Sequence, residues 1–403
     1  MELKPGYKQT EVGVIPDDWE ALSVFDIAER QKARFDDGDW IEAEHITDKG
    51  IRLIQTGNIG IGNYVEKEKK KYIYNASFDL LRCKPLEVGD LLICRLAEPA
   101  GRACILPNIG DEKVITSVDV TIFRPDEERF DRGYLVQYFS TSAWFDSILE
   151  NVGGTTHKRI SRSALGSIQI PIPIDKVEQS AISTALGDID ALLAAQDALI
   201  EKKRAIKQGA MQELLTGKRR LPGFSGEWEI KKLGDISHIK TGSRNNEDKV
   251  EDGDYPFFVR SEFVERIDGY SYDCEAILVP GEGKIGEIFH YINGRFDVHQ
   301  RVYAITRFSP EVSAPFVYLY LKMHFGAWAM QNTVKATVDS LRLPTFQNFE
   351  MRLPSTKEEQ VAIADALSDM GTEIVALEAK REKIAQLKQG MMQELLTGRI
   401  RLV

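Results

Sequence analysis

The clearest pattern that could bind a cofactor is a glycine-rich segment in the second half of the chain. Gly281-Glu282-Gly283-Lys284-Ile285-Gly286 has the spacing Gly-x-Gly-x-x-Gly and follows a stretch typical of a strand. A dinucleotide site needs a helix next, because the phosphates bind at its N-terminus. Residues 287–294 are instead typical of a strand and a turn, and Glu282 would repel a pyrophosphate. The segment favours a tight turn between strands; a loop that approaches DNA is a further interpretation.

Other patterns of catalysis or metal binding are missing from the sequence. There is no Gly-x-x-x-x-Gly-Lys-Ser/Thr loop for ATP and no Asp/Asn-Pro-Pro-Tyr/Phe signature of amino-methyltransferases. The six histidines are scattered, and the four cysteines, Cys83, Cys94, Cys104 and Cys274, lack CxxC spacing. We therefore expect no catalytic centre, no metal and reduced thiols. With no apolar run of roughly 18 residues and no signal-peptide core, we expect a cytoplasmic protein without a membrane partner.

The charge balance is acidic, with 62 Asp and Glu against 52 Lys and Arg and a net charge of -10. A protein that neutralises DNA phosphates needs Lys and Arg, so this balance is an obstacle to nucleic-acid binding. What matters, however, is whether the basic residues gather on one face. The acidic remainder could serve basic patches on partner proteins.

An internal repeat organises the chain. Residues 178–221 match residues 359–402 at a constant shift of 181, with about half the positions identical. A weaker match at a shift of 209 relates Trp19-Glu20 to Trp228-Glu229. The chain therefore consists of two copies of one plan, a variable block followed by a near-constant block. A period this long indicates a duplicated domain rather than a solenoid.

The near-constant blocks are predicted to be long helices. Pro173 and Pro354 precede them, and Gly217 and Gly398 follow as stop signals. About 37 residues would give a rod of roughly 55 Å. Apolar residues recur at steps of four and three, with Gln196 and Arg381 interrupting: Ile182, Leu186, Ile189, Leu193 and Ile200, then Ile363, Leu367, Met370, Ile374, Leu377 and Ile384. An antiparallel coiled coil of the two copies is the expected pairing.

The variable blocks are predicted to mix strands and helices. Strands are expected at 91–94, 114–123, 276–280 and 301–306, and helices at 134–149 and 315–330. The fold class is therefore α+β, with two mixed α/β domains related by a pseudo-two-fold and separated by an antiparallel two-helix coiled coil. The boundaries are domain 1 at 1–173, the first helix at 174–217, domain 2 at 218–354 and the second helix at 355–403.

Several sequence motifs together resemble those of one family. They are Gly6 to Pro16 followed by Trp19-Glu20, the central Leu221-Pro222-Gly223-Phe224-Ser225-Gly226-Glu227-Trp228, and the repeated Lys-Gln-Gly-x-Met-Gln-Glu-Leu-Leu-Thr-Gly at 207–217 and 388–398. Over its full length the chain resembles the specificity subunit of type I restriction-modification enzymes, which serve in phage defence.

The resemblance implies a non-catalytic subunit with two target-recognition domains. Each would read one half of a bipartite site in double-stranded DNA, and the paired helices would set the spacer between the halves. Two methyltransferase subunits would dock on it and bring S-adenosylmethionine, and restriction subunits would bring ATP and Mg. No cofactor is expected in this chain itself. A solitary methyltransferase or nuclease fused to its reader, and a purely structural coiled-coil adaptor, are the alternatives.

Candidate DNA-reading residues are Arg, Lys, His, Asn, Gln, Ser and Thr side chains in loops that could enter the major groove. In the first block they are Arg30, Lys32, Arg34, Gln55, Thr56, Asn58, Thr155, Thr156, His157, Lys158 and Arg159. In the second they are Lys240, Arg244, Asn245, Asn246, Arg260, Ser261, Lys284, His299, Arg301, Lys335 and Thr337. For each of them a solvated turn is the alternative.

Two basic runs have a different interpretation. The first, of Lys67, Lys69, Lys70 and Lys71, is either a solvated face or a contact to phosphates, which positions DNA without specifying its sequence. The basic residues of the long helices, Lys202, Lys203, Arg204 and Lys207 with Lys380, Arg381, Lys383 and Lys388, could contact spacer phosphates or a partner subunit.

Overall fold

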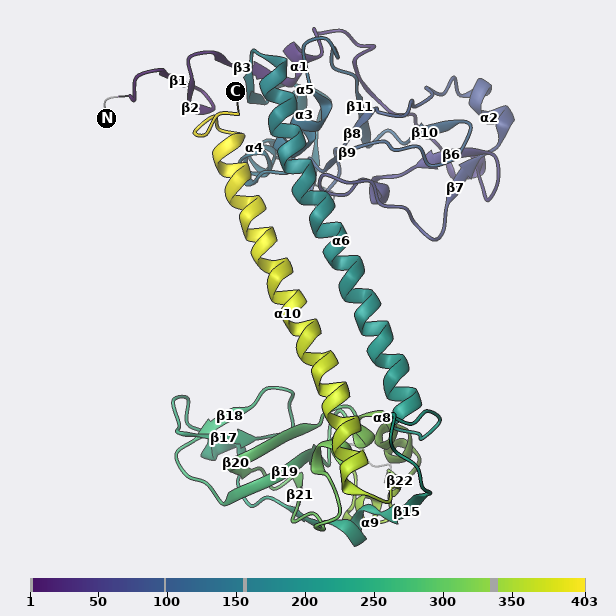
Figure 1. Ribbon diagram of the computed structural model, residues 1–403. Helices are drawn as coiled ribbons and strands as arrows, with labels where there is room; N and C mark the ends of the chain where they lie inside the picture. The colour runs from purple at the N-terminus through teal and green to yellow at the C-terminus, as the bar shows by residue number, and fades with distance from the viewer. Residues whose placement is uncertain (1–2, 98, 155–157, 334–339, 403) are drawn as a thin grey trace. The chain divides into compact units, whose positions relative to one another are not determined.

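The computed structural model describes residues 3–97, 99–154, 158–333 and 340–402. Two compact units make up the chain: unit 1 is Met1–Gln196 with Lys380–Val403, and unit 2 is Asp197–Ala379. Each unit holds one variable block and a part of both long helices, α6 (Lys176–Leu214) and α10 (Lys357–Leu395) (Figure 1). The division therefore runs through the two helices, not at their ends.

Short strands dominate the variable block of unit 1. They are β1 (Tyr7–Thr10), β2 (Gly13–Pro16), β3 (Trp19–Ser23), β4 (Phe35–Asp37), β5 (Ile46–Thr47), β6 (Ile51–Ile54), β7 (Lys71–Ile73), β8 (Leu91–Cys94), β9 (Ala103–Ile105), β10 (Val114–Thr116), β11 (Val120–Phe123), β12 (Val152–Gly153), β13 (Arg159–Ile160) and β14 (Gln169–Pro173). The helices are α1 (Val24–Ile27), α2 (Asn75–Leu80), α3 (Arg132–Tyr138), α4 (Ser142–Asn151) and α5 (Arg162–Ser167), with 3-10 turns η1 (Ala43–His45) and η2 (Thr56–Asn58).

The variable block of unit 2 has fewer and longer strands. They are β15 (Trp228–Lys232), β16 (His238–Thr241), β17 (Tyr255–Phe258), β18 (Glu265–Ile267), β19 (Tyr272–Pro280), β20 (His290–Val298), β21 (Val302–Thr306) and β22 (Glu350–Pro354). The helices are α7 (Leu233–Ile236), α8 (Ala314–Gln331) and α9 (Leu343–Gln347), with the 3-10 turn η3 (Asn246–Asp248).

The two units share one topology. The strand order β4-β11-β8-β9 in unit 1 corresponds to β16-β21-β19-β20 in unit 2. In both, the strand that begins with the repeated Trp-Glu pairs antiparallel with the last strand of the block, β3 with β14 and β15 with β22. Unit 1 adds a separate sheet, β10-β6-β7-β5, whereas unit 2 extends its main sheet with β17 and β18. The predicted duplication and the α+β fold class are confirmed.

The long helices pair antiparallel within each unit, as predicted. In unit 1, Asp190 lies 2.6 Å from Lys388, while Glu178, nearer the start of α6, bonds Arg401 beyond the end of α10. In unit 2, Arg204 lies 2.6 Å from Glu378. Several stripe residues are buried, namely Ile182, Leu186, Ile200, Ile363, Leu367, Ile374 and Ile384, and Gln196 is buried at the predicted interruption. A stripe that is apolar on one side gives each helix a face to bury.

The two helix ends are closed in the same way. Gly217 and Gly398, with φ of 69° and 70°, end the helices in the left-handed conformation that glycine favours. Each is followed by an arginine whose guanidinium lies over a tryptophan ring, Arg220 over Trp228 and Arg401 over Trp19. Both arginines bind a buried glutamate of the partner helix, Glu359 and Glu178 respectively. Arg401 donates hydrogen bonds to the carboxylates of Glu178 and Asp18, and these hydrogen bonds raise the pKa of Arg401.

Two sequence predictions need correction in unit 1. The single strand expected at 114–123 is two strands in different sheets, because Val120 N–H bonds Ser117 O and makes a turn. The single helix expected at 134–149 is α3 and α4, because Thr141 caps a new helix by accepting a hydrogen bond from Trp144 N–H. The helix expected at 315–330 is α8, as predicted.

Candidate nucleic-acid interface

Three segments of unit 1 meet where β8 ends. Ile160 N–H donates to Arg95 O at 3.0 Å, and Ala97 N–H donates to Lys158 O at 3.0 Å, so β13 is fixed to the turn after β8. Arg95 N–H in turn donates to Asp119 O at 2.8 Å in the β10–β11 turn. Lys158 and Arg159, two of the predicted readers, are thereby held at this corner.

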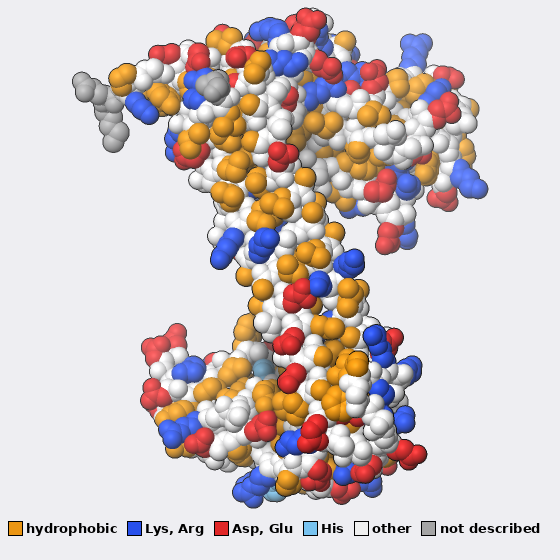
Figure 2. All heavy atoms as spheres, viewed as in Figure 1, with side chains coloured by type: hydrophobic (Ala, Val, Ile, Leu, Met, Phe, Trp, Pro, Cys, Tyr) orange, Lys and Arg blue, Asp and Glu red, His pale blue; other side chains and the backbone are white. Residues whose placement is uncertain are grey.

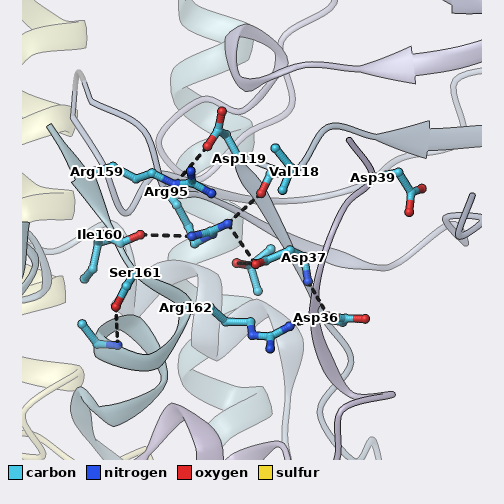
Figure 3. A network of polar contacts seen from close by, with 12 residues as sticks. Asp36, Asp37, Asp39, Arg95, Val118, Asp119, Arg159, Ile160, Ser161 and Arg162 are labelled. Atoms are coloured by element: carbon cyan, nitrogen blue, oxygen red, sulfur yellow. Dashed lines mark hydrogen bonds and ion pairs between the residues drawn. The ribbon is translucent and has the colours of Figure 1, made fainter. Parts of the chain in front are cut away.

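Arg95 is the structural centre of this corner (Figure 3). Its side chain is 3% exposed and donates to Ile160 O at 3.2 Å and Val118 O at 2.7 Å, and it pairs with Asp37 at 2.9 Å. Burial lowers the pKa of Arg95, and the negative charge of Asp37 opposes that shift. Because its donors face the protein, Arg95 holds the loop in place and is not itself presented to solvent.

Further ion pairs surround Arg95. Arg159 lies 3.1 Å from Asp119, and Arg162 binds Asp36. Lys84 also reaches Asp36, at 3.1 Å. Figure 3 shows Arg159 directed to Asp119 and Arg162 directed to Asp36, on either side of the Arg95 contacts. The predicted reader Arg159 is therefore held by a partner that sequence spacing did not reveal. Lys158 is exposed, and Thr155, Thr156 and His157 lie outside the described residues.

The second predicted loop of unit 1 lies close to the same corner. Arg102 donates to Thr56 O at 3.3 Å and to Cys94 Sγ at 3.4 Å, which ties η2 to the end of β8. Gln55 and Thr56 are half-buried. Asn58 is buried; its Oδ1 accepts from Gln55 N–H at 3.0 Å and its Nδ2 donates to Val65 O at 2.9 Å. Asn58 therefore shapes the loop, and its amide is not directed to solvent.

The structure does not bring the third predicted cluster of unit 1 to this corner. Phe35 pairs with Phe123 at the far end of β11 from Ser117, and Arg34 precedes it. Arg34 lies 3.6 Å from both Glu29 and Asp126. Arg30 pairs with Asp26 at 2.7 Å, and Lys32 is exposed. Arg30 and Arg34 therefore lie apart from the corner, whereas Lys32 is near enough to Asp36 for its charge to act on that carboxylate.

Unit 2 builds the corner with the same backbone. Leu341 N–H donates to Gly281 O at 2.8 Å, and Glu282 forms a backbone bridge with Ser340. In unit 1 the corresponding pairs are Ile160 with Arg95 and Arg159 with Leu96. The repeat shift of 181 relates Arg159 to Ser340 and Ile160 to Leu341, so the repeat and the hydrogen bonds agree. The Gly-x-Gly-x-x-Gly segment is the turn between antiparallel β19 and β20, as favoured above.

Five predicted readers of unit 2 gather at this turn: Arg260, Ser261, Lys284, His299 and Arg301. Glu282 lies between Arg260 and Arg301, at 3.3 and 3.2 Å. Lys284 lies 2.9 Å from Glu262, which follows Ser261. His299 is buried, and its Nδ1 accepts from Arg301 N–H at 3.0 Å. Burial, then Arg260 and Arg301, lower the pKa of His299.

The remaining predicted readers of unit 2 lie beside this group or apart from it. Arg244 bridges His299 through the backbone, and its Nε lies 3.0 Å from Asp297. Asn245 Oδ1 accepts from Gln300. Asn246 begins η3 and is exposed, and Lys240 is exposed on β16. Lys335 and Thr337 lie outside the described residues.

Basic side chains are mixed with acidic ones on the visible face of each unit: in Figure 2, Lys and Arg side chains lie among Asp and Glu side chains.

The described residues contain no group of three or more His, Cys, Asp or Glu placed to hold a metal ion. The four cysteines are free, and burial raises the pKa of the Cys104 thiol to about 12. No helix among the described residues is long and apolar enough to span a membrane.

Comparison with known proteins identifies the family. The sequence model of the type I restriction modification DNA specificity domain matches residues 16–202 and again residues 225–389. The chain belongs to this family. The two matches correspond to the two copies of the repeat, so the chain is a type I specificity subunit with two specificity domains.

Known specificity subunits resemble the chain over different lengths. The MjaX specificity subunit of Methanocaldococcus jannaschii is 24% identical, over 98% of this chain and 96% of its own. The EcoDI specificity subunit of Escherichia coli is 27% identical, over 42% of this chain and 37% of its own. The crystal structure of the specificity subunit from M. genitalium has a TM-score of 0.62 at 15% identity and covers 98% of both chains. That likeness confirms the fold over nearly the whole specificity subunit.

Three structural residues escaped sequence reasoning: Arg95, Arg102 and Glu282. Arg95 directly follows the buried strand β8, and Glu282 follows β19 by two residues. A charged residue just past a buried strand was the available signal. Sequence alone could not distinguish the buried Arg95 from the half-exposed Arg260 and Arg301.

Proposed function

We propose that this specificity subunit reads a bipartite site in double-stranded DNA, with one half-site for each unit. The observation that carries the proposal is the strand-end corner, which is built twice on one backbone plan with different side chains. A duplicated scaffold with unlike polar residues suits the recognition of two unlike sequences. Arg, Lys, Gln and Thr in such loops offer the donors and acceptors that base edges require.

The acidic net charge is compatible with this function. At both corners several arginines are paired with carboxylates, so neither corner is a simple phosphate-binding patch. Phosphate contacts supply affinity, whereas base contacts supply specificity. We assign the exposed lysines, such as Lys158 and Lys240, to the phosphates, and the solvent-accessible arginines Arg159, Arg260 and Arg301 to base edges.

The long helices would set the spacer between the half-sites. Each is a single helix of 39 residues that belongs to both units. At a rise of about 1.5 Å per residue, such a helix extends over roughly 58 Å. Two readers on one face of a duplex must be about one turn, roughly 34 Å, apart. A partly overlapping antiparallel pair is long enough to hold that separation.

The chain would act without catalysing a reaction itself. Two methyltransferase subunits would dock on it and bring S-adenosylmethionine, and restriction subunits would bring ATP and Mg. This assignment rests on the family. We propose that the assembled enzyme acts on DNA in the cytoplasm.

Methylome sequencing of cells that express the methyltransferase subunits tests the proposal. With this chain present, methylation should fall on one bipartite motif with a constant spacer. Methylation that is unchanged when the chain is removed would contradict the proposal. Adding one heptad after Ile189 and one at the matching position in the second copy should lengthen the spacer and leave both half-sites unchanged. Altered half-sites with an unaltered spacer would refute this division of roles.

A further inference from the structure

An Arg–Glu–Arg cluster at the turn after β19 distinguishes unit 2 from unit 1. Each carboxylate oxygen of Glu282 faces one guanidinium, that of Arg301 at 3.2 Å or that of Arg260 at 3.3 Å. The Glu282 side chain is 20% exposed, whereas those of Arg260 and Arg301 are 51% and 54% exposed. The carboxylate therefore lies inward, and the two guanidinium groups lie outward.

Backbone contacts fix the segments that carry the cluster. Glu282 bridges Ser340, Arg301 N–H bonds His299 Nδ1, and His299 N–H bonds Phe258 O at 3.0 Å. Because these partners lie on rigid strands or beside them, the two arginines start from defined positions. Such preorganisation reduces the entropy lost when a side chain binds its target.

The space beside the cluster is too small for a cofactor. Glu282, Gln300 and Arg301 contribute to a hollow of about 50 Å³. Ligand pockets are several times larger, at roughly 300 Å³ or more. The exposed parts of the guanidinium groups are thus available to a surface that approaches from outside, such as the edge of a base pair.

A carboxylate between two arginines disfavours a pure phosphate contact. Glu282 would repel the DNA backbone, but it can hold one edge of each guanidinium and leave the other free. An arginine presented in this way matches the O6 and N7 atoms of guanine with two parallel hydrogen bonds. Exposed ion pairs are weak, so either arginine can adjust to a base without a large loss.

On the basis of the proposed function, we infer that Arg260 and Arg301 read guanine in the second half-site and that Glu282 is the positioning residue that sets their specificity. The second half-site then contains at least one G·C pair. Unit 1 has other residues at the equivalent positions. The register of β11 with β8 and that of β21 with β19 place Asp119 where unit 2 has Arg301, and Leu96 where unit 2 has Glu282. The inference therefore concerns one half-site only.

The test uses the full chain with its methyltransferase subunits and methylome sequencing as the readout. Arg301→Lys and Arg260→Lys keep the charge but remove the planar fork. At least one should lose about 5- to 150-fold in discrimination at a G·C position of the second half-site, the range that one bidentate contact provides. Glu282→Gln should relax the same position and strengthen binding to unrelated DNA. The first half-site and the spacer should stay unchanged, which also shows that the variants fold.

Two further variants separate base reading from charge. Arg295 is as exposed as the two arginines of the cluster and pairs with Asp273 between β20 and β19, away from the turn, so Arg295→Lys should leave the motif unchanged. Lys284→Gln should weaken binding to all sequences alike and reduce the salt slope by about one. A second half-site without G·C, or an unchanged motif in Arg260→Lys, Arg301→Lys and Glu282→Gln, would overturn the inference. If the unmodified chain directs no methylation, it is the proposed function that fails.

Discussion

The corner after β8 in unit 1 and the corner after β19 in unit 2 reach one backbone geometry by different means. In unit 1, the buried Arg95 donates to Ile160 O. In unit 2, Gly281 stands at the place of Arg95, and Tyr303 Oη donates to Leu341 O at 3.3 Å. The carbonyl that receives the hydrogen bond is equivalent in the two units, but the donor comes from another strand. The hydrogen bond is kept while the side chains around it differ, so the backbone of the corner does not restrict which polar side chains each unit presents there.

The largest expected effect is the loss of the Arg95 guanidinium. Arg95→Met should destabilise unit 1 by about 3–5 kcal/mol, because Asp37 and two carbonyl groups lose their partner inside the protein. Urea unfolding followed by hydrogen exchange at β11 and β13 would measure the loss. Arg30→Met removes an exposed pair and serves as the control. An equal loss in both variants would contradict the central role given to Arg95.

A smaller effect is expected at the equivalent residue of unit 2. A Cβ added at Gly281 would lie 2.8 Å from the Tyr303 ring. Gly281→Ala should therefore cost about 1–3 kcal/mol through overpacking, measured by urea unfolding. Gly209→Ala, in α6 with no neighbouring atoms at the site, should be stabilising by about 0.5–1 kcal/mol. A neutral Gly281→Ala would mean that Tyr303 does not need this space.

Removing the Tyr303 hydroxyl should cost less again. Tyr303→Phe deletes one hydrogen bond and keeps the ring against Phe346, so a loss of about 1 kcal/mol is expected. Thermal unfolding would measure it. A loss as large as that of Arg95→Met would mean that the two donors contribute equally to stability.

The smallest expected effect is the pH response of His299 in unit 2. The pKa of His299 is lowered in the folded state, so below its ordinary value of about 6.5 the unfolded chain binds more protons. The stability contributed by neutral His299 is present above that pH and is lost as the pH falls. Unfolding midpoints between pH 7.5 and 5 should fall less in His299→Gln. His324 has a pKa lowered by burial too, so some pH dependence should persist.

The sequence predicted those parts of the fold that depend on local or repeated patterns. The helix stripes, the glycine stops and the turn at 281–286 each follow from residues close together in the chain. The pairing of Arg95 with Asp37 does not, because sheet formation must first bring β4 beside β11 and β8. For the same reason the sequence could not tell that Arg34 lies at the other end of β11 from Asp119.

The candidate site was predictable by residue type but not by role. Arg260, Lys284 and Arg301 are at the surface, where a reader must be. Asn58 has the right chemistry, yet its buried amide is used within its own loop. Sequence reasoning also passed over Glu282 as a mere objection to phosphate binding, although it is the residue that groups the two arginines.

The division of the chain into units has a consequence for its synthesis. Unit 2 is one continuous segment, whereas unit 1 needs residues 380–403 to complete its core. Leu395 and Leu396 lie in that core with Trp19, Leu186 and Ile182. A ribosome releases residues 1–196 first. Their apolar surface stays uncovered until the end of α10 emerges, after the whole of unit 2. The part of the protein made first is therefore the part finished last, and it is the part exposed longest to chaperones and proteases.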